Sequence, residues 1–233
     1  MIILLMGPPG AGKGTQARRI EDKYNIIQLA TGDMFRERIA SGDAFGKKIK
    51  DIVEGGNLVP DELTIQMIKE RIAQPDCENG FILDGFPRTV EQAEGLTEML
   101  SEAGLQLDTV VQIEADDDAL VERISGRFTC SGCDEGYHDS FKQPKVEDTC
   151  DCCGAEDKFT RRADDTEEKV KVRLGVYHGQ TAPVLTYYDG KNMLEKVDGM
   201  QDMDDVTASI STILDGVVGG DARPRKNGSN PTL

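Results

Sequence analysis

The stretch "GPPGAGKGT", residues 7–15, directly follows a short apolar run at residues 2–6. The apolar run predicts a buried strand, and the residues from Gly14 onward predict a helix. A strand, a glycine, four further residues, Gly12 and Lys13, and then a helix form the arrangement that turns backbone N–H groups toward a phosphate. Glycine lets the backbone approach closely, and the Lys13 ammonium can follow the terminal phosphates. The sequence therefore predicts a phosphate-binding loop.

One position of this loop differs from the general pattern. Phosphate-binding loops commonly continue from the lysine with Ser or Thr, whose hydroxyl binds magnesium. Here Gly14 stands in that place, and Thr15 comes one residue later. The loop is therefore expected to hold phosphate without supplying a hydroxyl to the metal.

The rest of the chain alternates short β-branched runs with helical stretches, which predicts a parallel sheet covered by helices on both faces. The expected strands are residues 2–6, 26–29, 81–83, 109–113 and 193–197. The expected helices are residues 14–23, 33–40, 44–54, 61–73, 90–103, 116–125, 166–188 and 203–214, with Asp33, Asp61 and Thr89 as N-cap residues. Together with the loop, this pattern predicts an α/β fold like that of the P-loop NTPases, with a five-stranded parallel sheet.

Two stretches are longer than the usual connections in such a sheet and are expected to form movable inserts. We call residues 31–60 the first insert and residues 128–165 the second insert. A single domain is expected over residues 1–215, with its core formed by residues 1–30, 61–127 and 166–215. Residues 216–233 are poor in apolar side chains, so a disordered tail is expected there.

Composition restricts the class of partner. The formal net charge is −16, which argues against general affinity for nucleic acid or anionic membranes. The apolar start has no basic residue before it and is shorter than the apolar region of a secretory signal. No stretch is long enough to span a bilayer. A cytoplasmic protein is expected, whose anionic ligands are held by local lysines and arginines.

Four further motifs follow the loop. They are "TGDMFR" at residues 31–36, "DGFPRT" at 84–89, "RISGR" at 123–127 and "RRADD" at 161–165. In this order the loop and the four motifs resemble the adenylate kinase family, in its long-lid bacterial form. In that family the two inserts are the NMP-binding insert and the lid, and magnesium is carried mainly by the nucleotide phosphates and water. The resemblance therefore accounts for Gly14.

The resemblance also implies which residues bind each ligand. It implies that AMP is held by Thr31, Arg36, Val59, Gly85, Arg88, Gln92, Arg162 and Arg173. It implies that ATP is bound by Gly10, Ala11, Gly12, Lys13, Gly14, Thr15, Arg123, Arg127, Tyr137, His138 and Met200. It implies that the catalytic residues are Lys13, Arg88, Arg123, Arg127, Arg162 and Arg173, with Asp84 near the magnesium.

The chemistry of the residues agrees with this assignment. Bringing ATP and a monophosphate together places several negative charges close to each other, and arginines offset such charge best because they bind phosphate bidentately and stay protonated. A monoester phosphate is already ionised at pH 7, so no general base is needed. Outside a motif, an arginine is usually a solvated surface charge. Arg123 and Arg127 are expected on one side of a helix end, at i, i+4 spacing.

Four cysteines of the second insert have the spacing of a structural zinc site. Cys130, Cys133, Cys150 and Cys153 form two Cys-x-x-Cys pairs separated by sixteen residues. A reducing compartment disfavours disulfides, and iron is the alternative metal. Cys152 could compete for a ligand position, and the family register implies that Cys150 and Cys153 are the ligands. The insert has few large apolar residues, so the metal is expected to supply its folding energy.

Three functions remain open at this point. The first is adenylate kinase, a monomer that uses Mg²⁺ and converts ATP and AMP into two ADP. A CMP or UMP kinase would share the loop and the arginines, but members of that group usually carry a short lid. A non-catalytic nucleotide sensor with a zinc ribbon is the third, although the second insert carries ten acidic against five basic side chains and would repel nucleic acid.

Overall fold

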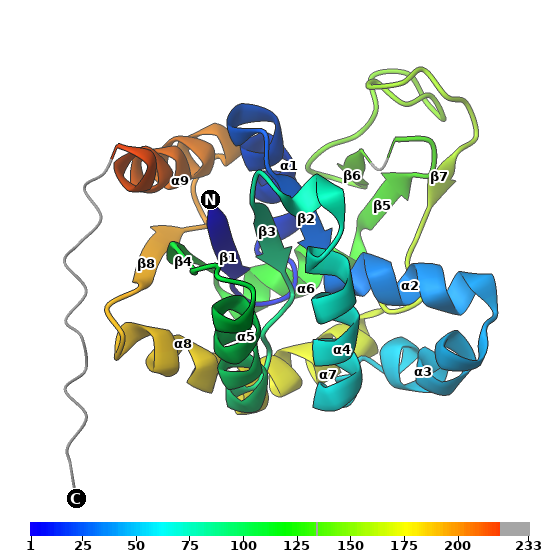
Figure 1. Ribbon diagram of the computed structural model, residues 1–233. Helices are drawn as coiled ribbons and strands as arrows, with labels where there is room; N and C mark the ends of the chain where they lie inside the picture. Colours follow the sequence, from blue (N-terminus) through cyan, green and yellow to red (C-terminus); the bar gives the residue numbers. More distant parts are fainter. Residues whose placement is uncertain (134, 220–233) are drawn as a thin grey trace, which may run out of the picture.

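The computed structural model describes residues 1–133 and 135–219, and its centre is a parallel sheet with helices on both sides (Figure 1). The sheet has five strands in the order β2-β3-β1-β4-β8, and each pairs in parallel with its neighbours. The strands are β1 (Ile2–Met6), β2 (Ile27–Ala30), β3 (Phe81–Asp84), β4 (Thr109–Glu114) and β8 (Leu194–Asp198). The predicted α/β fold with a five-stranded parallel sheet is confirmed.

Alternation along β1 explains the two layers of helices. Ile3 and Leu5 face one side and pack with helices α1, α6, α7 and α9, whereas Ile2, Leu4 and Met6 face the other side. The second face is covered by α4, α5 and α8. The helices are α1 (Lys13–Tyr24), α2 (Thr31–Ser41), α3 (Ala44–Glu54), α4 (Asp61–Ile72), the 3₁₀ turn η1 (Pro75–Cys77), α5 (Val90–Glu102), α6 (Asp117–Ser125), α7 (Glu167–Val176), the π segment η2 (Tyr177–Thr181), α8 (Ala182–Asp189) and α9 (Met203–Val218).

Three helix predictions need correction. Helix α2 begins at Thr31 with Ala30 as its cap residue, and the Asp33 carboxylate accepts from Arg36 and Arg162 instead of capping the helix. Pro60, not Asp61, precedes α4 as its cap residue. The helix expected over residues 166–188 is divided by η2, just before Pro183, which has no N–H to donate. Thr89 does cap α5, since its hydroxyl accepts from the Gln92 N–H.

Helix α9 is longer than expected. Helix α9 continues to Val218, past the position where the sequence predicts a tail. The Asp215 carboxylate accepts from Lys23 and Tyr24 of α1, and these bonds hold the last turns in place. The remainder of the predicted tail, residues 220–233, lies outside the described residues. In the described part of the chain, every helix is too short or too polar to cross a membrane.

The first insert contains α2 and α3, which pack on a small apolar cluster of their own. Phe35, Ile49 and Val59 are its buried members. The second insert holds a separate antiparallel sheet, in the order β6-β5-β7. Its strands are β5 (Arg127–Cys130), β6 (Gly136–His138) and β7 (Phe159–Thr160). Figure 1 shows the two inserts on the same side of the main sheet, beyond the carboxyl end of β1.

Candidate active site

The loop after β1 wraps around the start of α1 as the sequence predicts. Gly12 adopts a left-handed conformation (φ 91°) just before the helix, and it leaves the first N–H groups of α1 without a side-chain cap. A Cβ at Gly7 would lie 2.4 Å from the Ile113 carbonyl oxygen, so the chain there needs glycine. The Lys13 ammonium donates to the Gly7 and Pro8 carbonyl oxygens, at 2.8 Å each. This is the geometry of an anion-binding helix start.

Asp84 lies beside the unusual Gly14. A Cβ at position 14 would be 3.8 Å from the Asp84 carboxylate, which ends β3 and accepts from the Gln28 amide. The side chain that most phosphate loops place after lysine would therefore point toward a carboxylate. Magnesium is bound in such sites by one or two carboxylates together with phosphate oxygens. The donor set of this corner fits Mg²⁺ brought in with a nucleotide.

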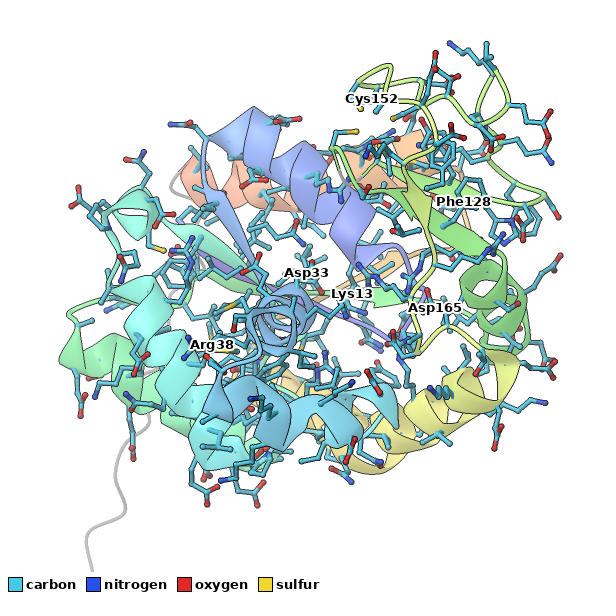
Figure 2. The ribbon with its side chains drawn as sticks, turned by 90° about the vertical axis from the view of Figure 1, so that its right-hand side faces the viewer. Lys13, Asp33, Arg38, Phe128, Cys152 and Asp165 are labelled. Carbon is cyan, nitrogen blue, oxygen red and sulfur yellow. The ribbon has the colours of Figure 1, made fainter. Side chains whose placement is uncertain are left out.

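The cations of the site come from elements far apart in the sequence. Lys13, Arg88, Arg127 and Arg173 are close enough to influence one another, and each of these arginines contributes to lowering the pKa of Lys13. Burial is the largest cause, and it brings the pKa of the Lys13 ammonium from its ordinary 10.5 to about 8, against an opposing pull from Asp84. Burial likewise lowers the pKa of Arg88 to about 10. A compact group of cations thus lies next to the loop, and Figure 2 labels its lysine, Lys13, between Asp33 and Asp165 in that view.

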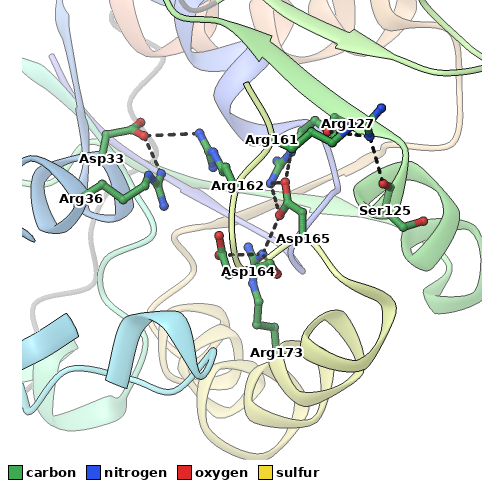
Figure 3. A network of polar contacts seen from close by, with 9 residues as sticks. All are labelled: Asp33, Arg36, Ser125, Arg127, Arg161, Arg162, Asp164, Asp165 and Arg173. Carbon is green, nitrogen blue, oxygen red and sulfur yellow. Dashed lines mark hydrogen bonds and ion pairs between the residues drawn. The ribbon is translucent and has the colours of Figure 1, made fainter. Parts of the chain in front are cut away.

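Carboxylates hold these arginines in position. Asp165 is only 6% exposed and accepts two parallel bonds from Arg127, at 2.7 and 2.9 Å, and one from Arg173 at 3.1 Å. Asp164 lies 3.0 Å from Arg173. Figure 3 shows this network, in which the acids fix the orientation of the guanidinium groups. The motif "RRADD" contains both the arginines and the acids, but only the arginines were expected to have a role in the site.

A third carboxylate joins the two inserts. Asp33 of the first insert accepts from Arg36 at 2.5 Å and from Arg162 of the second insert at 3.3 Å (Figure 3). Burial lowers the pKa of Arg162 to about 10, with Arg127 and Arg36 adding to the effect. Arg36 and Arg162, which the resemblance implies as AMP-binding residues, therefore share one carboxylate between the two inserts.

The residues expected around the monophosphate lie at the end of β3. The Thr31 hydroxyl and the Arg88 Nε both donate to the Gly85 carbonyl oxygen, at 2.8 and 2.6 Å. The Gln92 side chain is buried, and it accepts from the Arg88 N–H and donates to Asp61. Gln92 is therefore a buried partner of Arg88 and Asp61 and not an exposed helix residue.

Two other predicted residues lie near the end of β4 and β8. Arg123 donates to the Gly199 carbonyl oxygen at 3.2 Å, and a Cβ at Gly199 would lie 3.5 Å from the Ala11 carbonyl oxygen of the loop. Met200 follows directly and is 42% exposed. The predicted i, i+4 arrangement of Arg123 and Arg127 is wrong, because α6 ends at Ser125 and Arg127 begins β5.

Tyr137 and His138 have their side-chain polar groups engaged. The Tyr137 hydroxyl contacts the Cys150 sulfur at 3.4 Å and accepts from the Asp151 N–H. The His138 Nε2–H donates to the Glu122 carbonyl oxygen at 3.1 Å, and its Nδ1 accepts from Ser140 and Phe141 N–H groups. These contacts attach the second insert to α6.

The four predicted cysteines come together in space. The sulfur atoms of Cys130, Cys133, Cys150 and Cys153 all lie within 4.8 Å of one another. The Cys130–Cys153 and Cys133–Cys150 sulfur distances are 3.7 and 3.6 Å. A tetrahedral zinc with Zn–S bonds of about 2.3 Å places its sulfurs about 3.8 Å apart. The arrangement therefore fits a four-thiolate metal site, and Cys152 lies outside this group.

The second insert has more of a core than its sequence predicts. Phe128, Tyr137 and Phe159 pack together with ring centroids 5.1–5.6 Å apart, next to Cys130 and Cys150. The aromatic cluster is small and shares its interior with the cysteines. A metal would therefore add to an existing apolar contact instead of supplying all of the folding energy.

A phosphate loop on a parallel sheet, with Arg88, Arg127 and Arg173 beside its lysine, defines a nucleotide kinase of the P-loop class. The family model described as adenylate kinase matches residues 5–193, and the chain belongs to the adenylate kinase family. Curated proteins named adenylate kinase are similar to this chain over most of its length and nearly all of theirs. That of Allorhizobium ampelinum is 51% identical over 93% of this chain and 100% of the relative.

Two further relatives support the same assignment. The adenylate kinase of Rhizobium rhizogenes is 52% identical over 92% of this chain and 99% of its own length. The adenylate kinase of Acetivibrio thermocellus is 48% identical over 93% of this chain and 99% of its own length. The match includes the cysteine-bearing insert, which argues against a non-catalytic sensor.

The lowered pKa of Lys13 predicts a stability effect. Between pH 8 and 10.5 the native state binds fewer protons at Lys13 than the unfolded state does, so the free energy of unfolding rises with pH across this window. Below pH 8 both states are protonated and the native state carries the full penalty. We expect Lys13→Met to be more stable than the unsubstituted protein at pH 7, and the difference to shrink toward pH 10. Urea unfolding of both ligand-free proteins at pH 7, 8, 9 and 10 measures this.

A difference in stability that stays constant from pH 7 to 10 would contradict the assignment. Lys69→Met serves as the control, because Lys69 is an exposed partner of Glu102 on the surface. The difference in the free energy of unfolding between Lys69→Met and the unsubstituted protein is not expected to shrink from pH 7 to 10.

Proposed function

We propose that this chain catalyses the reversible transfer of the γ-phosphoryl group of MgATP to AMP, giving two ADP. The proposal is carried by one observation, the convergence of Lys13, Arg88, Arg127 and Arg173 on the phosphate loop, in a chain of the adenylate kinase family. The positive charges of these four side chains repel one another in the free protein. They complement the negative charges of two nucleotide phosphate chains. We also propose a cytoplasmic monomer that does not bind nucleic acid.

The proposed roles follow from where each group lies. Residues 10–15 hold the ATP phosphates through their N–H groups, with Lys13 moving from the carbonyl oxygens of Gly7 and Pro8 onto the phosphates. Arg88, held by Gly85 and Gln92, orients the AMP phosphate. Arg123, Arg127, Arg162 and Arg173 then stabilise charge on the group in transfer. Transfer is in line, without a covalent enzyme intermediate and without a general base.

Mg²⁺ enters with ATP and neutralises phosphate charge when bound, and Asp84 is the carboxylate proposed to hold it through its water ligands. The remaining AMP contacts are proposed for Thr31, Arg36, Val59 and Gly85. Thr31 already donates to the Gly85 carbonyl oxygen, so both residues define the floor of that subsite. Tyr137, His138 and Met200 are proposed to shape the ATP subsite through backbone and van der Waals contact, since the polar groups of the two rings are engaged elsewhere.

Closure of the two inserts is proposed to exclude water, which competes with AMP as phosphoryl acceptor. The Asp33–Arg162 contact joins the inserts at 3.3 Å and supports this proposal. The cysteine site is proposed to bind structural Zn²⁺ through Cys130, Cys133, Cys150 and Cys153. Four thiolates leave no open coordination position, so this metal takes no part in transfer.

A coupled assay of ADP formation tests the reaction. With MgATP present and AMP, CMP, UMP or GMP offered in turn, we expect rapid turnover with AMP alone. Lys13→Met is expected to lower kcat by about a hundredfold or more, because it removes a cation aimed at the reacting phosphates. Lys69→Met, on the surface, is expected to keep full activity.

Two results of this assay would overturn the proposal. Turnover with CMP or UMP in place of AMP would retain the kinase and replace its substrate. A folded protein without turnover on any of the four monophosphates would remove the kinase assignment itself.

Removal of the proposed metal gives a separate prediction. A strong chelator is expected to raise amide hydrogen exchange in residues 127–160 and to weaken ATP binding, while the parallel sheet stays protected. Cys153→Ser is expected to lose the metal, whereas Cys152→Ser in the same segment keeps it, because Cys152 lies outside the sulfur cluster. Metal content by mass spectrometry and hydrogen exchange measure both effects. One cooperative unfolding transition that a chelator leaves unchanged would contradict the proposal.

A further inference from the structure

A ring of hydrogen bonds joins the first turns of α4 and α5, two helices that pack against each other (Figure 1). The Gln92 side-chain amide donates from Nε2 to one Asp61 oxygen at 2.7 Å, and its Oε1 accepts from the Arg88 N–H at 2.8 Å. The other Asp61 oxygen accepts from the Thr89 hydroxyl at 3.0 Å. That hydroxyl accepts in turn from the Gln92 N–H at 3.1 Å. Both ends of the Gln92 amide are therefore engaged within the ring.

Asp61 determines which way round this amide lies. A backbone N–H only donates and a carboxylate only accepts, so Oε1 of Gln92 must face Arg88 and its Nε2 must face Asp61. Gln92 is 2% exposed, and the reversed amide would set donor against donor and oxygen against oxygen, away from bulk water. Among residues 1–133 and 135–219, the Asp61 carboxylate bonds only to Gln92 and Thr89. Its contacts therefore serve this ring alone.

The ring supports Arg88, the residue proposed to orient the AMP phosphate. Gln92 holds the Arg88 backbone, and the Arg88 Nε donates to the Gly85 carbonyl oxygen at 2.6 Å. In the described part of the chain, the two terminal guanidinium nitrogens have no hydrogen-bond partner. A guanidinium that is fixed at its backbone and at Nε, with both outer nitrogens open, suits bidentate binding of a phosphate. A shift of the Arg88 backbone would misplace this fork.

Asp61 also lies at the junction with the first insert. It directly follows residues 31–60, and Val59, which the resemblance implies as an AMP contact, lies two residues earlier. Val59 is 4% exposed and packs in one apolar cluster with Phe35 and Ile49 of the insert. Asp61 therefore connects the segment that carries Val59 to the loop that carries Arg88, on two sides of the proposed monophosphate site.

We propose that Asp61 is a positioning residue for the monophosphate substrate, which acts through Gln92 and Arg88 without touching the nucleotide. The inference rests on the proposed function and deepens it, because it assigns the orientation of a buried amide to a carboxylate outside the four motifs. The acid at the start of α4 is not the helix cap. Its carboxylate is instead used across the gap to α5.

Two substitutions of Asp61 separate orientation from charge. Asp61→Leu removes both acceptors with little change in size, and we expect the Kd and KM for AMP to rise about tenfold, with the KM for ATP unchanged within about twofold. Asp61→Asn keeps the ring, because its oxygen accepts from Gln92 and its NH₂ donates to the Thr89 oxygen. It should bind AMP within about twofold of the unsubstituted protein. Titration calorimetry and steady-state kinetics measure these values.

Glu62→Leu is the matched control. Glu62 is an exposed acid in the same helix turn, so its loss removes the same favourable charge from the start of α4 without touching the ring. The affinity for AMP should not change in this variant.

Proton NMR of the ligand-free proteins gives a readout that does not depend on nucleotide. The Gln92 side-chain amide protons should exchange slowly with water in the unsubstituted protein and in Asp61→Asn, because a buried bond holds them. Their exchange should be at least about tenfold faster in Asp61→Leu. Glu62→Leu should leave it unchanged.

Four results would overturn the inference. Unchanged AMP affinity in Asp61→Leu, with the Gln92 protons exposed, would reject the positioning role and leave the proposed function in place. An equal rise in KM for AMP and ATP would indicate a general loss of structure. Asp61→Asn as weak as Asp61→Leu would show that charge acts and not orientation. An unsubstituted protein that binds no AMP would remove the proposed function and the inference with it.

Discussion

The repulsion among cations gathered at one edge of the sheet is the constraint on which the rest of the site depends. Lys13, Arg88, Arg127 and Arg173 are partly or largely removed from water, and each arginine helps to lower the pKa of Lys13. A free protein tolerates this arrangement only where acids or carbonyl oxygens hold the charges apart. The phosphates of bound nucleotides relieve the repulsion, so the energy stored in the empty site becomes affinity for polyphosphate.

The acids that accept from these arginines are the second part of this arrangement. Asp165 takes one arginine from β5 and one from α7, and Asp33 takes one from each insert. Asp165 therefore also ties the second insert to the core, and Asp33 joins the two inserts to each other. Movement of an insert and redistribution of charge are coupled, because an arginine that turns to phosphate must leave or share its acid.

Sequence analysis predicted the sheet and the loop because both rest on local patterns. The apolar run of β1 and the glycine–lysine spacing that follows it need no distant partner. The sulfur cluster was also predictable, since the spacing of its two Cys-x-x-Cys pairs is typical of metal ligands. Asp33 and Asp165 were not, because only the fold shows which arginines each acid meets. Asp165 is buried among them, whereas the Asp33 side chain remains 54% exposed. The predicted position of Arg127 on the same side of a helix end as Arg123 was wrong for a related reason. Gly126 ends α6, and Arg127 then pairs with His138 across strands β5 and β6, a contact distant in sequence.

Proton uptake on nucleotide binding tests the central claim most directly. Calorimetry of ATP binding at pH 8, in buffers of different ionisation enthalpy, counts the protons taken up as the Lys13 pKa returns toward 10.5. The nucleotide phosphates are fully ionised at this pH and contribute little. The account predicts uptake of roughly half a proton at pH 8 and almost none at pH 6.5 from Lys13, and none from a Lys13→Arg control at pH 8. Equal uptake by the two proteins at pH 8 would contradict it.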